Sequence, residues 1–188
     1  MNMRRSILIL GLFLFWGCSS SYNVVVKDDP YKQSVFVRVD MRHKAVEGGL
    51  ENETMSYEKE IKGGKPSPVT VFFRFYASSY YNSRELEEKV YLLIDGRYFT
   101  LPIFNKKSES EIENTYPGGG RRYYWPGPVY ITESRYITGK FQLSSEAEAA
   151  LGRARDYSFR VYMDSESTTF RATEAELSAL KRFLAAGR

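Results

Sequence analysis

One short run of this sequence combines guanidinium groups with large aromatic rings. The run consists of Arg121, Arg122, Tyr123, Tyr124 and Trp125. Tyr, Trp and Arg are the residues that most often dominate binding interfaces. Because a glycine triplet precedes the run and a proline follows it, we expect a loop that presents these side chains to a protein or glycan partner. The alternative is that Tyr123 and Trp125 point inward from a strand and fill one end of the core.

Few other residues offer groups for catalysis or metal binding. His43 is the only histidine, and since it lies between Arg42 and Lys44 we expect a solvated loop residue. No Gly-x-Ser-x-Gly elbow or phosphate-binding glycine loop occurs. Zinc sites draw mainly on Cys and His, of which the chain has one each. Carboxylates such as Glu58 and Glu60 are too common to indicate a glycoside hydrolase. We therefore expect no enzyme, no metal site and no cofactor.

The only cysteine, Cys18, follows a short apolar segment near the N-terminus. Arg4 and Arg5 precede the uncharged run 7–16, ILILGLFLFW, and three serines follow the cysteine at 19–21. The run is shorter than the ~20 apolar residues of a membrane-spanning helix. It has the length of the hydrophobic region of a secretory signal, ~7–15 residues. In this order the residues resemble the signal peptide and lipobox of a bacterial lipoprotein precursor.

The resemblance covers residues 1–21 and implies how the chain reaches a membrane. Cleavage would precede Cys18, the sulfur would carry a diacylglycerol, and the new amino terminus would be acylated. Phe15 and Trp16 replace the usual Leu and small residue, so this is a relaxed box. The residue after the cysteine is Ser19 and not Asp. By resemblance to lipoprotein sorting in enteric bacteria, this favours the outer membrane. The alternative is an ordinary signal peptide, or an uncleaved anchor, with an incidental cysteine.

Length and charge limit the class of the remaining chain. Residues 18–188 have the length of one domain, within the usual ~100–200 residues. The formal net charge is +4, of which Arg4 and Arg5 supply two charges. So small a value argues against a nucleic-acid binder, which normally carries a clustered basic face. With a single cysteine the chain cannot form an intramolecular disulfide, so the core alone must stabilise the fold.

Alternating apolar residues predict strands joined by tight turns. Nine strands are predicted, at 34–41, 55–61, 69–76, 89–95, 97–104, 129–132, 135–143, 157–163 and 168–172. The apolar second face of 69–76 indicates a central strand, whereas the weak pattern of 55–61 indicates an edge. Asp95-Gly96 between two apolar runs predicts a hairpin turn, because such turns need positive φ. We expect loops at 43–52 and 105–128.

Two helices are predicted from capping boxes and apolar stripes. The boxes are Ser145 with Glu148, and Thr173 with Glu176. The second helix would end the chain. Hairpin connections imply antiparallel pairing, so we expect a mainly β fold, an antiparallel β-sandwich of about eight or nine strands with two short helices. A strongly curved β-barrel is the alternative.

These patterns predict three regions and a location. Residues 1–17 are the signal peptide, 18–33 the lipidated N-terminus and tether, and 34–188 a single β-sandwich domain. Within the tether, residues 22–26 are a candidate first strand. We expect a protein of the bacterial cell envelope, held at the outer membrane by lipid on Cys18, whose domain binds a protein or assembly partner. A carbohydrate- or cell-wall-binding module using 121–125 is the alternative, and an envelope hydrolase is the weakest one.

Overall fold

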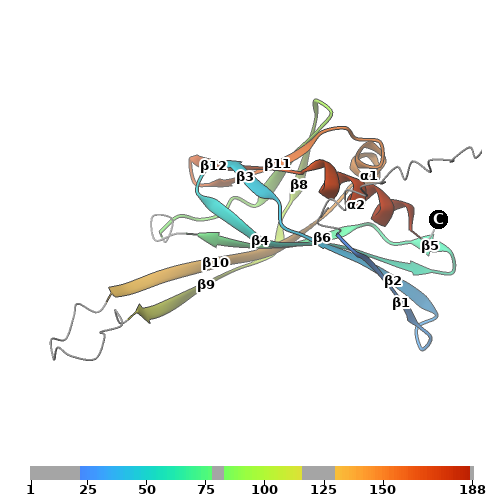
Figure 1. Cartoon of the computed structure of the whole chain (residues 1–188), viewed down its shortest axis with the longest axis horizontal. Helices are drawn as coiled ribbons and strands as arrows, with labels where there is room; N and C mark the ends of the chain where they lie inside the picture. The colour runs from blue at the N-terminus through green and yellow to red at the C-terminus, as the bar shows by residue number, and fades with distance from the viewer. Residues whose placement is uncertain (1–21, 78–82, 116–129, 187–188) are drawn as a thin grey trace, which may run out of the picture.

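A computed structural model describes residues 22–77, 83–115 and 130–186 of the chain. This part of the chain is mainly β, with twelve strands in two antiparallel sheets and two helices, the second of them C-terminal (Figure 1). The predicted fold class, an antiparallel sandwich with two short helices, is therefore confirmed, with more strands than expected.

The large sheet has seven strands in the order β1–β2–β4–β6–β10–β9, with the short β5 paired to β4. Their bounds are β1 Val24–Asp29, β2 Ser34–Met41, β4 Leu50–Lys62, β5 Lys65–Pro66, β6 Thr70–Ala77, β9 Phe104–Thr115 and β10 Tyr130–Gln142. Apolar residues alternate along β2, β6 and the inner part of β10, so one face of the sheet is buried there and the other is open to solvent. In β6, for example, Val71, Phe73 and Phe75 face the core.

The small sheet has five strands in the order β3–β12–β11–β7–β8. Their bounds are β3 Lys44–Glu47, β7 Lys89–Ile94, β8 Arg97–Pro102, β11 Tyr157–Met163 and β12 Glu166–Arg171. The β7–β8 turn is the predicted one, since Asp95 and Gly96 have φ of 46° and 81°. Phe75 of the large sheet lies 5.1 Å, between ring centroids, from Phe170 of the small sheet, so aromatic stacking joins the two layers.

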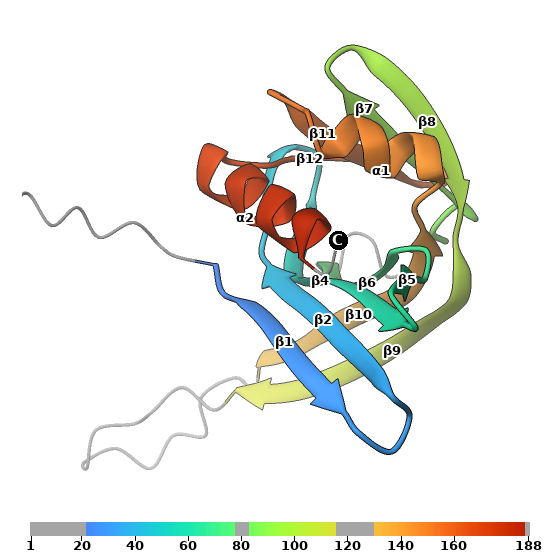
Figure 2. The ribbon, with the colours of Figure 1, turned by 90° about the vertical axis from the view of Figure 1, so that its right-hand side faces the viewer.

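Helix α2 (Glu174–Ala185) lies in the space between the sheets on the side of β1 and β2, and α1 (Ser145–Leu151) lies beside it (Figure 2). The capping box of Thr173 and Glu176 is formed as predicted. The buried ammonium of Lys59 donates a hydrogen bond to the Leu184 carbonyl at 2.9 Å, which satisfies one of the open carbonyls of the last turn of α2.

The box predicted for α1 is wrong. Ser144, not Ser145, is the N-cap, and its hydroxyl accepts from the Ala147 N–H. Glu148 instead accepts a hydrogen bond from the backbone N–H of Val69, 2.7 Å away. The carboxylate therefore ties α1 to the start of β6 and does not return to its own helix.

The large sheet corrects several predicted boundaries. Residues 55–61 belong to β4, which lies between β2 and β6 and is not an edge strand. The predicted loop 43–52 contains β3 and the start of β4, and the first part of the predicted loop 105–128 is strand β9. The segment 18–33, predicted as a tether, is folded from Tyr22 onward, because β1 pairs along its whole length with β2. Pairing with other strands, which local patterns do not show, decided each of these points.

Candidate functional site

The outer face of the large sheet carries a cluster of cationic and aromatic side chains. Antiparallel register places Arg74 of β6 opposite Thr138 of β10, and Thr138 opposite Lys107 of β9. Two residues further along β10, Lys140 lies between Phe72 on β6 and Phe104 on β9. Residues opposite one another share a face of the sheet. The pairing of three strands therefore gathers side chains that are far apart in the sequence.

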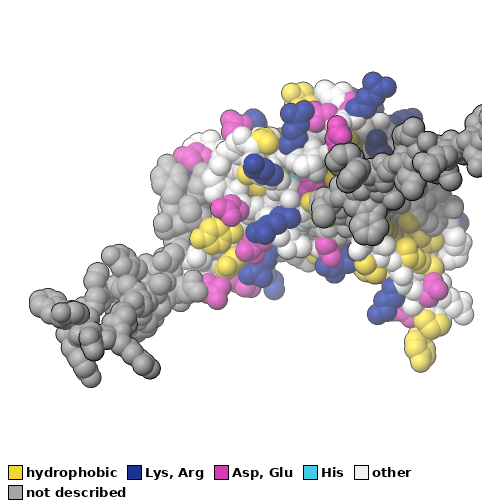
Figure 3. Space-filling view, viewed as in Figure 1, with side chains coloured by type: hydrophobic (Ala, Val, Ile, Leu, Met, Phe, Trp, Pro, Cys, Tyr) yellow, Lys and Arg dark blue, Asp and Glu magenta, His cyan; other side chains and the backbone are white. Residues whose placement is uncertain are grey.

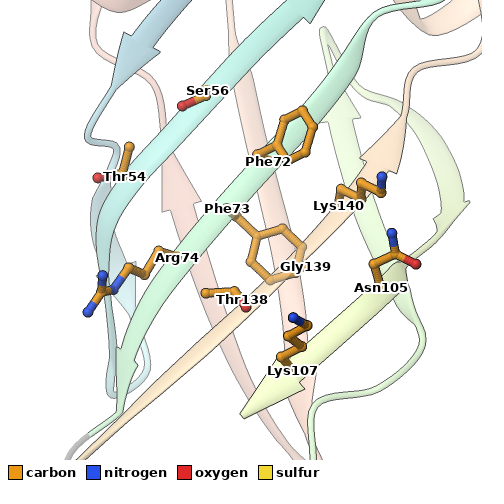
Figure 4. A pocket seen from close by; sticks show the side chains of 10 residues that line it. All are labelled: Thr54, Ser56, Phe72, Phe73, Arg74, Asn105, Lys107, Thr138, Gly139 and Lys140. Atoms are coloured by element: carbon orange, nitrogen blue, oxygen red, sulfur yellow. The ribbon is translucent and has the colours of Figure 1, made fainter. Parts of the chain in front are cut away.

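These residues line a shallow groove of about 530 Å³ across β4, β6, β10 and β9 (Figure 4). Its walls consist of Thr54, Ser56, Phe72, Phe73, Arg74, Asn105, Lys107, Thr138, Gly139 and Lys140. Among the described residues that line the groove, three are cations and none is a carboxylate. Elsewhere, on the face that Figure 3 shows, positive and negative side chains are interspersed. The groove thus concentrates positive charge locally on a chain whose formal net charge is only +4.

Ring contacts and one ion pair hold Arg74 and Lys140 of the groove in place. The Arg74 guanidinium lies 4.1 Å from the centre of the Tyr136 ring and 3.0 Å from a carboxylate oxygen of Glu53. The Lys140 ammonium lies 5.5 Å from the ring centre of Phe72 and 5.2 Å from that of Phe104. Cation–ring contacts of this kind contribute ~0.5–1 kcal/mol at exposed sites. These contacts pre-order Arg74 and Lys140 before any ligand arrives.

An exposed aromatic ring adds an apolar contact to the groove. Phe72 is 38% exposed, one of few large apolar side chains on the described surface with that much exposure. Phe73, its neighbour, points the other way and is 4% exposed, and Figure 4 shows its ring beneath Gly139. A groove with an open ring flanked by cations suits an anionic ligand that also carries an apolar group.

Gly139 keeps the bottom of the groove open. The strand pairing between β10 and β9 shifts register between Thr138 and Lys140, and a Cβ on Gly139 would lie 2.5 Å from Cζ of Phe73. We expect Gly139→Ala to displace the Phe73 ring and to lower the free energy of unfolding by ~1–3 kcal/mol, the usual cost of overpacking. Urea unfolding monitored by circular dichroism would measure this. Gly152→Ala is the matched control, since the nearest atom to its Cβ is 3.5 Å away. Equal midpoints for the two variants would contradict the tight packing at Gly139.

A second polar cluster lies in the interior, and it corrects the prediction for His43. His43 is 1% exposed and lies where the chain passes from β2 in one sheet to β3 in the other. Its Nε2 is 3.0 Å from the Tyr57 hydroxyl, which in turn is 3.2 Å from the Tyr157 hydroxyl. Its Nδ1 is 3.4 Å from Oε1 of Glu176, an ion-pair distance without hydrogen-bond geometry. The cluster links both sheets to α2.

Glu176 stays ionised at the centre of this cluster. Burial acts to raise the pKa of its carboxyl, but the His43 imidazole and the Thr173 backbone and hydroxyl outweigh burial, so the pKa lies below its ordinary 4.5. Thr173 N–H donates to Oε2 at 2.7 Å, and the Tyr22 hydroxyl donates to Oε1 at 3.3 Å. Burial also raises the pKa of the Tyr57 hydroxyl well above 10. None of the described residues that line the groove belongs to this cluster, whose contacts join both sheets to α2.

The site residues predicted from sequence lie outside the described residues. Cys18 and the run Arg121, Arg122, Tyr123, Tyr124 and Trp125 belong to this group, so their predicted roles stay predictions. Sequence reasoning missed the groove. One sequence signal pointed toward it. In the alternating strand 69–76, the apolar Phe72 lies on the face opposite Phe73 and Phe75, where a polar residue would be expected. Nothing local marked Lys107 or Lys140, which only the strand register brings to Phe72.

Comparisons with protein-family models, with curated proteins and with solved structures gave no match to this chain. Within the described ranges, neither helix has the length and apolar character needed to cross a bilayer. The same residues contain no group of three or more His, Cys, Asp or Glu side chains placed to hold a metal ion.

Proposed function

We propose that this chain is a lipoprotein of the bacterial cell envelope, anchored in the outer membrane by lipid on Cys18. Its sandwich domain binds an acidic protein partner through the outer groove, without catalysis. The observation that carries the binding role is the groove itself, in which Arg74, Lys107 and Lys140 surround the open ring of Phe72. Carboxylates of a partner would meet three cations there and no carboxylate among the described lining residues.

The start of the folded chain supports a position close to the membrane. The backbone carbonyl of Tyr22 accepts a hydrogen bond from Arg182 of α2 at 3.0 Å, and the Tyr22 hydroxyl reaches Glu176. Only residues 19–21 separate this fixed point from Cys18. Since an extended chain spans at most ~3.6 Å per residue, a lipidated Cys18 holds the domain within ~15 Å of the bilayer surface. The partner would then be a component of the envelope.

The groove is tested by changing its charge and its ring in the full chain. We expect Lys140→Glu combined with Phe72→Ala to weaken binding of a fluorescent glutamate- and tyrosine-containing peptide about tenfold, because a favourable charge becomes repulsive and the apolar contact is lost. Fluorescence anisotropy at several salt concentrations would measure this. Lys65→Glu, a charge reversal at an exposed lysine outside the groove, should leave binding unchanged.

Three outcomes distinguish the proposals. Salt-sensitive binding that is lost only in the groove variant supports the acidic partner. Equal binding by the groove variant and by Lys65→Glu overturns the groove as the site. Binding of neutral glycans that survives both changes would replace the acidic partner by the carbohydrate alternative, with the aromatic run 121–125 as its expected site.

A further inference from the structure

Strand β9 ends the large sheet and leaves one of its edges without a partner strand among the described residues. It pairs with β10 on one side and stands last in the sheet order. Residues 105–111 are all exposed. An edge strand presents a row of open backbone N–H and C=O groups, which is a template for another strand. The twelve residues of β9 make this edge twice as long as the six-residue β1 at the other side of the sheet.

Among the described strands, the outer part of β9 has one neighbour, β10. Pairing between β10 and β6 ends at Arg135 opposite Ala77, whereas pairing between β10 and β9 continues to Tyr130 opposite Thr115. Figure 1 shows this two-stranded arm extending away from the body of the domain. A two-stranded ribbon by itself is marginally stable in water, and further strands stabilise it. A strand added along β9 would supply that support.

The charges along β9 are complementary to those of the same strand run in the opposite direction. In an antiparallel pair with a two-fold axis at Ser108, Lys107 of each copy stands opposite Glu109 of the other. Axes at Lys107 or Glu109 would place like charges directly opposite one another, which is destabilising. Shifting one strand by a single residue would place side chains that point to opposite faces of the sheet across from one another. The charge pattern therefore selects the axis at Ser108.

We propose that β9 is the interface through which two copies of this chain pair, edge to edge and antiparallel, about a two-fold axis at Ser108. The interface is isologous, because the same strand contributes on both sides. The two large sheets become one continuous sheet, and the outer grooves of the two copies lie on the same face of it. This inference concerns an edge of the sheet and goes beyond the groove and its partner, and the two surfaces share Lys107.

A cysteine placed on the axis tests the register. We expect Ser108→Cys, in a Cys18→Ser background that removes the only native cysteine, to form a disulfide-linked dimer under mild copper–phenanthroline oxidation. Residues facing each other across an antiparallel pair have Cα atoms ~4.5–5.5 Å apart, which is within reach of a disulfide. Ser165→Cys in the same background, exposed in the β11–β12 turn, should stay largely monomeric. Equal cross-linking at both positions would overturn the proposed axis.

A charge exchange tests the interface without a covalent bond. We expect Lys107→Glu and Glu109→Lys, each alone, to raise the dimer dissociation constant of the full chain in detergent at least tenfold, because each places like charges opposite. The double exchange should restore pairing, since the opposite charges return with their positions swapped. Sedimentation equilibrium measures the constants. A wild-type chain that stays monomeric at high micromolar concentration, or a double variant no better than the singles, would overturn the proposal. Peptide binding at the groove is measured independently, with the variant that changes Phe72 and Lys140, so failure of one proposal can be told from failure of the other.

Discussion

Glu176→Ala is expected to lower the free energy of unfolding by about 3 kcal/mol, because it removes a buried acceptor and leaves the donors of Thr173 and Tyr22 unsatisfied, at ~1–3 kcal/mol each. The carboxylate is 1% exposed and contacts His43, Thr173 and Tyr22. Alanine removes the capping-box acceptor of α2, and it leaves the buried imidazole without its acidic neighbour. Urea unfolding at pH 7, followed by far-ultraviolet circular dichroism, gives the value.

The matched variant Glu176→Gln separates charge from hydrogen bonding. Glutamine keeps an oxygen that accepts the Thr173 N–H, so we expect a smaller loss of about 1–2 kcal/mol at pH 7. Because the folded pKa of Glu176 lies below the ordinary 4.5, its ionised form stabilises the fold above that pH. This contribution is lost as the pH falls from 4.5 through the lower folded pKa. The stability difference between wild type and Glu176→Gln should therefore narrow below pH 4.5. A difference that stays constant from pH 7 to pH 3 would show that the carboxylate is not held ionised.

Cys18→Ala is expected to transfer the protein from the membrane pellet to the soluble fraction. Each buried CH₂ of an acyl chain contributes ~0.8 kcal/mol, and stable anchoring takes at least two lipid signals. A cysteine with a diacylglycerol and an acylated amino terminus meets this condition, and alanine removes all of it. The measurement is fractionation of cells that produce the full chain, followed by a high-salt wash and immunoblotting.

Mass spectrometry and a neighbouring substitution control this result. Ser20→Ala should leave the protein in the pellet, because the serine carries no lipid. The mature wild-type protein should begin at Cys18 and have the added mass of its acyl chains. The lipid-anchor proposal fails if the alanine variant still pellets after its leader is removed, or if Cys18 is unmodified. Because binding at the groove is measured by anisotropy, that result would leave the groove proposal standing.

Local sequence signals predicted the elements whose cause is local. Alternation of Val71, Phe73 and Phe75 predicted β6, since a strand with one buried face repeats every two residues. Asp95-Gly96 predicted the β7–β8 turn, because both residues adopt positive φ. Thr173 predicted the start of α2, since a capping box lies within four consecutive residues. These features depend on neighbours in the chain and need no knowledge of the sheet order.

Local signals were wrong wherever the deciding neighbour lay far away in the sequence. Arg42 and Lys44 suggested a solvated His43, but the chain crosses between the sheets there and buries the ring against Tyr57 and Glu176. The polar residues of β4 suggested an edge. The strand is central: Glu58 and Glu60 lie on its outer face, whereas the buried Lys59 lies on the inner face with Tyr57.

The sequence by itself determined the mainly β class, the tight turns, the capped final helix and the expectation of a lipid anchor, because each follows from residues close together in the chain. The tertiary structure alone decided the groove and the buried cluster. Phe72, Lys107 and Lys140 come together only through the antiparallel register of β6, β10 and β9. Register is fixed by which apolar faces are buried together across the whole sheet. No short stretch of sequence contains that information.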